Sequence, residues 1–124
     1  MTFHEQYAIA AATTLAVELP IVLLVVRRAQ LMVSDVRVLG AALLANLLTH
    51  PMLWYVPYFA FRRALAPGNY GLYLVVGEGL TLLIETVVYW ALLVRHRPWL
   101  ALAMSALANA ASYGAGLLLW PVLR

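Results

Sequence analysis

Acidic, amide and imidazole side chains stand at intervals inside long apolar stretches of this 124-residue chain. A charged side chain at the centre of a membrane-spanning helix costs about 2.5 to 3.5 kcal/mol, so such residues point to a functional site. We therefore treat them as candidates for binding a substrate or a proton, and we assign no catalytic residue. The candidates are Glu18, Asn46, His50, Glu78, Glu85, Asn109 and Ser112.

The spacing of the candidates places them on shared helix faces. Residues three or four positions apart lie on one side of a helix, as Asn46 and His50 do, and as Asn109 and Ser112 do. At a rise of about 1.5 Å per residue, four candidates fall at one depth near the middle of their helices. These four are Glu18, Asn46, Glu85 and Asn109. We expect the polar faces to turn inward and to meet in one layer.

Carboxyl groups buried next to one another can exchange a proton for a cation. Burial disfavours the charged form, so we expect at least one of Glu18, Glu78 and Glu85 to be protonated at neutral pH when no cation is bound. The chain is therefore predicted to bind or transport a small cation or cationic solute, with proton exchange at Glu18 and Glu85. Whether a metal binds stays open, with Glu18, His50 and Glu85 as the candidate ligands, and no cofactor can be named from these residues.

The elements that must position these residues are four long helices. The chain is 65% hydrophobic and only 10% charged, with a mean hydropathy of +0.89. Since a soluble domain needs a charged surface, this composition predicts an all-α integral membrane protein. We expect one transmembrane domain over residues 1–124, an antiparallel four-transmembrane-helix bundle with short loops and no internal repeat. The predicted helices cover approximately residues 7–26, 36–60, 70–94 and 98–120.

Arginine predicts the orientation, because cytoplasmic loops carry an excess of basic residues. The arginines of the loops at 27–37 and 95–98 are Arg27, Arg28, Arg37, Arg95 and Arg97, against Arg62, Arg63 and Arg124 on the other side. We therefore expect a multi-pass membrane protein with these two loops in the cytoplasm and both termini outside. The basic residues lie between apolar stretches rather than along one face, so we expect no nucleic-acid partner.

Aromatic and small residues suggest structural roles. We expect the aromatic residues near the outer helix ends to form an interfacial belt rather than a ligand-stacking site. They are Tyr7, Trp54, Tyr55, Tyr58, Phe59, Phe61, Tyr70, Tyr73 and Trp120. Ala106, Ala110 and Gly114 recur every four residues and predict a tightly packed face on the last helix.

The carboxylate in the sequence Ala16-Val17-Glu18, in the first of four short helices, makes the chain similar to the small multidrug-resistance transporters. The resemblance is one of architecture. It does not extend to the other helices, because that family does not usually carry two further glutamates in its third helix. Nor does its second helix usually carry an Asn-x-x-Thr-His-Pro sequence, which here covers residues 46–51.

Two other classes of function remain open. The chain could be an accessory or structural subunit of a larger membrane complex, whose polar layer specifies packing, or an intramembrane metal-dependent enzyme. We expect binding or transport rather than catalysis, because the His and Glu residues lack the spacing of known metal sites in helical bundles. Besides the lipid bilayer, we expect a homo-oligomeric or membrane-complex partner, since four helices enclose little volume.

Overall fold

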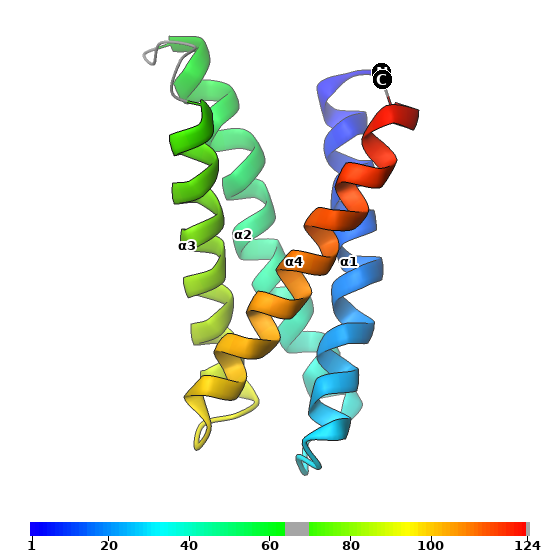
Figure 1. The fold of residues 1–124 in the computed structure, drawn as a ribbon, viewed down its shortest axis with the longest axis vertical. Coiled ribbons are helices and arrows are strands. Elements are labelled where there is room, and N and C mark those ends of the chain that lie inside the picture. Colours follow the sequence, from blue (N-terminus) through cyan, green and yellow to red (C-terminus); the bar gives the residue numbers. More distant parts are fainter. Residues whose placement is uncertain (64–69, 124) are drawn as a thin grey trace.

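A computed structural model describes residues 1–63 and 70–123, with the side chains of residues 1–56 and 71–122. The described chain is helical apart from its short connections, and it contains no strand. Its four helices are α1 (Phe3–Arg28), α2 (Asp35–Arg63), α3 (Tyr70–Leu92) and α4 (Pro98–Leu123), shown in Figure 1.

Two of the helices begin earlier than predicted, because a side chain caps each of them. Thr2 accepts a hydrogen bond from the Glu5 backbone N–H, while the Glu5 carboxylate accepts one from the Thr2 backbone N–H at 2.6 Å. This capping box lets α1 begin at Phe3 rather than near residue 7. Ser34 caps α2 in a similar way, since its hydroxyl accepts from the Arg37 N–H at 3.3 Å.

The helices form a ring in which each packs against two neighbours, in the order α1, α2, α3, α4 and back to α1. Consecutive helices run in opposite directions, so both termini lie at one end and the connections 29–34 and 93–97 lie at the other (Figure 1). The helix α4 runs obliquely, lying beside α3 near the 93–97 connection and beside α1 near its own C-terminal end. We call these the loop end and the terminal end.

An apolar core fills the loop end of the bundle. All four helices contribute fully buried side chains to it, among them Val22, Val26, Val38, Ala42, Tyr89, Ala101 and Met104. The predicted packing face of α4 does not pack within the chain, since Ala106 and Ala110 are exposed and a Cβ added to Gly114 would meet nothing within 4 Å. The face that packs instead carries Ala101 and Ala108.

The remaining surface is apolar. Large side chains that a soluble protein would bury point outward on every helix, including Leu47, Leu72, Val75, Leu118 and Val122. Conversely, the buried residues include Glu18, Asn46, Thr49, Thr81, Glu85 and Ser105. Each of the four helices is long and apolar enough to cross a membrane. Polar groups inside and apolar groups outside are the distribution that lipid requires of a helical bundle.

Candidate functional site

Glu18 lies near the middle of α1 with only 1% of its surface exposed. Its Oε2 accepts a hydrogen bond from Asn46 Nδ2 of α2 at 2.8 Å, and its Oε1 pairs with Ser112 Oγ of α4 at 2.7 Å. The second N–H of Asn46 donates to the carbonyl of Ala42 in its own helix at 3.0 Å. The carboxyl group thus joins α1 to both of its neighbours in the ring.

Glu85 occupies the corresponding place in α3, also with 1% exposed. Its Oε2 accepts a hydrogen bond from Asn109 Nδ2 of α4, and its Oε1 pairs with Thr49 Oγ1 of α2 at 3.0 Å. Ser105 Oγ approaches Oε2 at 3.4 Å. The second N–H of Asn109 donates to the carbonyl of Ser105 at 2.8 Å. Glu85 therefore joins α3 to α2 and α4.

The two carboxyl groups have equivalent surroundings. Each is held by one asparagine amide from the following helix and by one hydroxyl from the other neighbour, with Asn46–Thr49 on α2 matching Asn109–Ser112 on α4. The other buried positions of α2 and α4 repeat as well. At a constant offset, Val38, Ala41, Ala42 and Ala45 of α2 correspond to Ala101, Met104, Ser105 and Ala108 of α4. No repeat is visible in the sequence, yet in the structure α1–α2 and α3–α4 repeat one arrangement of these side chains.

The hydroxyl partners let each carboxyl group exist in either protonation state. Ser112 has a second acceptor within reach, the carbonyl of Asn109 at 3.1 Å, and Thr49 has the carbonyl of Ala45 at 3.0 Å. A hydroxyl has one proton but can also accept. When the carboxyl is ionised, the hydroxyl donates to it. When the carboxyl is protonated, it donates to the hydroxyl, whose proton turns to the backbone carbonyl. No heavy atom has to move.

A cavity of about 690 Å³ extends from the layer of Glu18 and Glu85 toward the terminal end of the bundle. All seven candidate residues line it: Glu18, Asn46, His50, Glu78, Glu85, Asn109 and Ser112. Its inner end meets the apolar core, and its outer end is lined by Phe3, Gln6 and Trp120 near the termini. Three of the described lining residues are glutamates and none is an arginine, while the chain has no lysine. The cavity is therefore suited to a cation.

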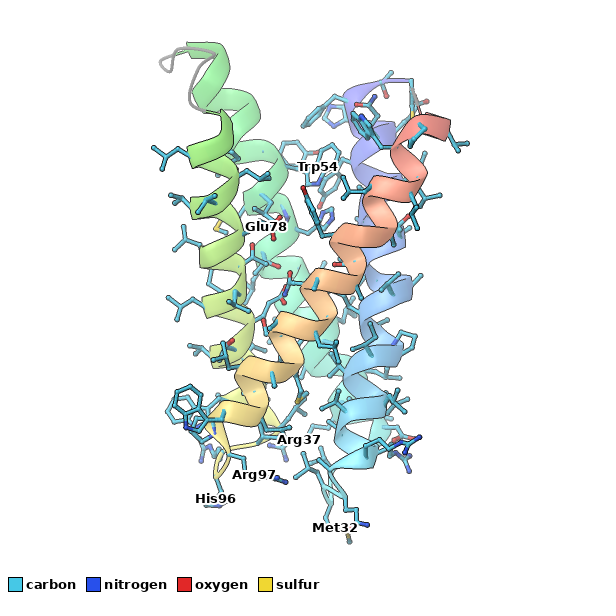
Figure 2. All side chains as sticks on the ribbon, viewed as in Figure 1. Met32, Arg37, Trp54, Glu78, His96 and Arg97 are labelled. Atoms are coloured by element: carbon cyan, nitrogen blue, oxygen red, sulfur yellow. The ribbon has the colours of Figure 1, made fainter. Side chains whose placement is uncertain are left out.

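Glu78 differs from the other two glutamates. It is half-buried, lines the cavity and makes no hydrogen bond with a residue of the described part of the chain. Figure 2 shows it inside the bundle on the Trp54 side, while Arg37, His96 and Arg97 lie at the loop end. Its carboxyl group is thus the one of the three that no described side chain engages by a hydrogen bond.

Three buried polar atoms lack a partner among the described residues, namely His50 Nδ1, Thr81 Oγ1 and Tyr89 OH. His50 and Thr81 line the cavity, while Tyr89 is fully buried in the apolar core. Buried polar groups nearly always have a partner, so each orphan needs an explanation such as water or a ligand.

Aromatic rings surround the outer part of the cavity. His50 stacks on Trp54 with ring centroids 6.2 Å apart, and Tyr7 lies 5.4 Å from the His50 ring. Trp54, Tyr73 and Trp120, which we expect to belong to an interfacial belt, also line the cavity. The side chains of Tyr58, Phe59, Phe61, Arg62, Arg63 and Tyr70, and the whole of Arg124, lie outside the described residues.

Sequence reasoning missed two residues of the site. Thr49 and Thr81 were visible as polar positions, but the sequence offered no reason to prefer them over hydroxyls that bond their own helix. The one available signal for Thr49 was its place three residues after Asn46, which matches that of Ser112 after Asn109. The metal candidates Glu18, His50 and Glu85 all line the cavity, yet no three acidic or histidine side chains of the described chain gather closely enough to hold a metal ion.

Comparisons of the chain with protein-family models, with curated proteins and with solved structures gave no significant match.

Proposed function

We infer that the protein binds a small organic cation in its cavity and exchanges it for a proton held by Glu18 and Glu85, as a step in moving the cation across a membrane. The observation that carries this proposal is a cavity of about 690 Å³ lined by three glutamates and by no described basic side chain other than His50. Cavities of roughly 300 to 1,000 Å³ suit small-molecule ligands. The apolar walls and the rings around the outer part favour an organic cation over a bare ion.

The proton exchange is supported by the hydroxyl pairs. Ser112 and Thr49 can accept a proton from a neutral carboxyl or donate to an ionised one, so loading and unloading a proton requires no repacking. Two carboxylates in one buried layer repel each other, so the arrival of a cation favours release of a proton. The other titratable side chains around the cavity are His50, Glu78, Tyr73 and Tyr113.

We propose that the bundle spans the membrane with the loops at 27–37 and 95–98 in the cytoplasm. Arg37 and Arg97 lie together at the loop end, and Arg27 pairs there with Asp35. In this orientation the cavity opens toward the outside and the apolar core separates it from the cytoplasm. Transport would require a second conformation in which the loop end opens.

Calorimetry on the purified protein in detergent tests the exchange. We would titrate 2-phenylethylammonium and its N,N,N-trimethyl analogue in buffers of different ionisation enthalpy, which reports the number of protons released. We expect at least one of the two cations to bind with proton release. Glu18→Gln and Glu85→Gln should each reduce that release, because glutamine mimics the protonated carboxyl in shape and hydrogen bonding.

Asp35→Asn is the matched control, since Asp35 is an exposed acid at the loop end that pairs with Arg27. It should leave cation binding and proton release unchanged. In liposomes with a pH gradient, the two glutamine variants should lose proton-driven uptake while remaining folded and monodisperse. Absence of binding by both cations, or proton release that is unchanged in the Glu18→Gln/Glu85→Gln variant, would contradict the proposal.

The alternative is an accessory subunit of a membrane complex or of a homo-oligomer. The observation that favours it is the exposed row of small residues on α4, Ala106 and Ala110, of a kind that lets helices approach one another closely in lipid. In that case the glutamine variants would change assembly or stability, and the parent protein would show no proton-driven uptake.

A further inference from the structure

Two contacts between α2 and α3 bracket a short stretch of each helix on the terminal side of the carboxyl layer, about one turn of α2 (residues 49–53) and about two turns of α3 (residues 77–85). Thr49 of α2 meets Glu85 of α3 at 3.0 Å, and the side chain of Leu53 reaches Gly77, where an added Cβ would lie 2.8 Å from Leu53 Cδ2. Because the two helices are antiparallel neighbours, these two stretches lie against each other.

Three polar side chains of these two stretches line the cavity, namely His50 on α2 and Glu78 and Thr81 on α3. Glu78 has no hydrogen-bond partner in the described chain, and Thr81 Oγ1 and His50 Nδ1 are buried without one. Thr81 is 2% exposed and His50 is 9% exposed, so neither is satisfied by open solvent. Three groups without described partners, on facing stretches of two helices that line one cavity, indicate a missing ligand rather than three separate defects.

All three groups can accept a hydrogen bond. The Glu78 carboxylate and the Thr81 hydroxyl oxygen have free lone pairs. His50 Nε2 lies 3.4 Å from Thr14 Oγ1, and the tautomer whose Nε2–H donates to Thr14 leaves Nδ1 as an acceptor. The complement of one negative and two neutral acceptors is a cation with three donors, which a primary ammonium group provides.

We propose that Glu78, Thr81 and His50 bind the ammonium group of a primary amine that has an apolar or aromatic body. This assignment rests on the cation-binding function proposed above and names its substrate class. Leu53, Trp54 and Leu117 line the same cavity and contact the body of the ligand. Trp54 lies on the terminal side of Glu78 in Figure 2, as expected for a body that extends toward the mouth.

The division of roles among the glutamates follows from their partners. Glu18 and Glu85 each already engage both carboxyl oxygens with side chains of the neighbouring helices, so they hold protons. Glu78 engages none of the described side chains and supplies the counter-charge. A quaternary ammonium would leave Thr81 and His50 without donors, and a metal ion would find fewer than three acidic or histidine ligands in reach within the described residues.

The test compares 2-phenylethylammonium with its N,N,N-trimethyl analogue, which has the same charge and body but no N–H. Binding to the purified protein in detergent is measured by calorimetry. We expect the primary amine to bind at least about tenfold more tightly, since each hydrogen bond to a charged group contributes about 1.5 to 3 kcal/mol. Equal affinities, or tighter binding of the quaternary cation, would overturn the assignment while leaving the cation-binding function in place.

Thr81→Val is the decisive variant, because it removes an unpartnered hydroxyl and conserves shape. It should fold normally and unfold at the same temperature as the parent or higher, yet bind the primary amine about tenfold more weakly with unchanged affinity for the quaternary cation. Thr86→Val is the matched control on α3, since that hydroxyl donates to the Leu82 carbonyl at 2.6 Å and does not line the cavity.

Glu78→Gln completes the test. It should weaken the binding of both cations, because both need the counter-charge. Primary-amine affinity that is unchanged in Thr81→Val or in Glu78→Gln would refute the assigned site. If neither cation binds the parent protein, the cation-binding function itself fails, which separates the two proposals.

Discussion

Asparagine and hydroxyl side chains hold the two buried glutamates in different ways. Asn46 and Asn109 each donate one N–H to a carbonyl of their own helix and the other N–H to a carboxyl oxygen. These two acceptors determine the orientation of each amide. Thr49 and Ser112 carry a single proton that can point either way. The amides therefore position the carboxyl groups, and the hydroxyls allow them to change charge.

Thr49→Val tests the role of the hydroxyl at the residue scale. Valine conserves the shape of threonine but leaves Glu85 Oε1 without its partner, which should lower the unfolding free energy by about 1 to 3 kcal/mol. It should also reduce proton release on cation binding. Thr49→Ser keeps the hydroxyl and should retain proton release. Unfolding in detergent and the calorimetric proton count check both effects, and parent-like values for Thr49→Val would show that this hydroxyl is not needed.

The sequence predicts the depth of the polar layer better than its pairing. Counting residues from the helix ends brings Glu18, Asn46, Glu85 and Asn109 to one level, and the structure joins each glutamate to an asparagine. Which asparagine meets which glutamate depends on the order of the helices around the ring and on their rotation. Neither is encoded in the spacing along one helix. Thr49 was missed for the same reason.

At the scale of elements, the four helices follow from apolar length alone, but their ends and contacts do not. The capping box at Thr2 and the Ser34 cap extend helices beyond their apolar stretches. Contacts between helices depend on single residues as well. Pro57 cannot donate to the Leu53 carbonyl in α2, and Tyr73 of α3 donates to that carbonyl at 3.0 Å. This hydrogen bond lies one turn from Gly77, where Leu53 packs against α3.

Two glycines of α3 provide a matched pair for this contact. A Cβ at Gly77 would lie 2.8 Å from Leu53 Cδ2, whereas one at Gly79 would meet nothing within 4 Å. Gly79→Ala should stabilise the protein by about 0.5 to 1 kcal/mol through helix propensity. Gly77→Ala should give no such stabilisation, because the new methyl group would force the Leu53 side chain to move. Thermal unfolding in detergent checks the difference, and Leu53→Ala should restore part of it. Equal effects of the two substitutions would mean that α2 and α3 are not in close contact there.

At the scale of the whole molecule, the two helical hairpins form one site between them. Glu18 of the first hairpin takes its hydroxyl from Ser112 of the second, and Glu85 of the second takes its hydroxyl from Thr49 of the first. The repeat is not visible in the sequence for two reasons. The difference in residue number between equivalent positions of α1 and α3 is not the same as that between equivalent positions of α2 and α4, and few equivalent positions carry the same residue type. A single chain thus forms a cavity of about 690 Å³ that residues of all four helices line.

The bundle is open at one end and closed at the other, which thiol labelling can test because the chain has no cysteine. Ala10 lines the cavity, and Ala101 is fully buried in the apolar core of the loop end. In membrane vesicles of known sidedness, Ala10→Cys should react with a membrane-impermeant cationic methanethiosulfonate added on the side of the termini. Ala101→Cys should react from neither side, because no water-filled path reaches it.

The same experiment determines orientation and occupancy. If the loops at 27–37 and 95–98 are cytoplasmic, Ala10→Cys should be labelled in intact cells without permeabilisation. Excess 2-phenylethylammonium should slow that labelling several-fold, because the amine and the reagent share the mouth of the cavity. In vesicles with the loop end outward, labelling of Asp35→Cys should be unaffected by the amine. Labelling of Ala10→Cys from the loop side alone would reverse the orientation. Rapid labelling of Ala101→Cys would mean that the apolar core does not seal the bundle.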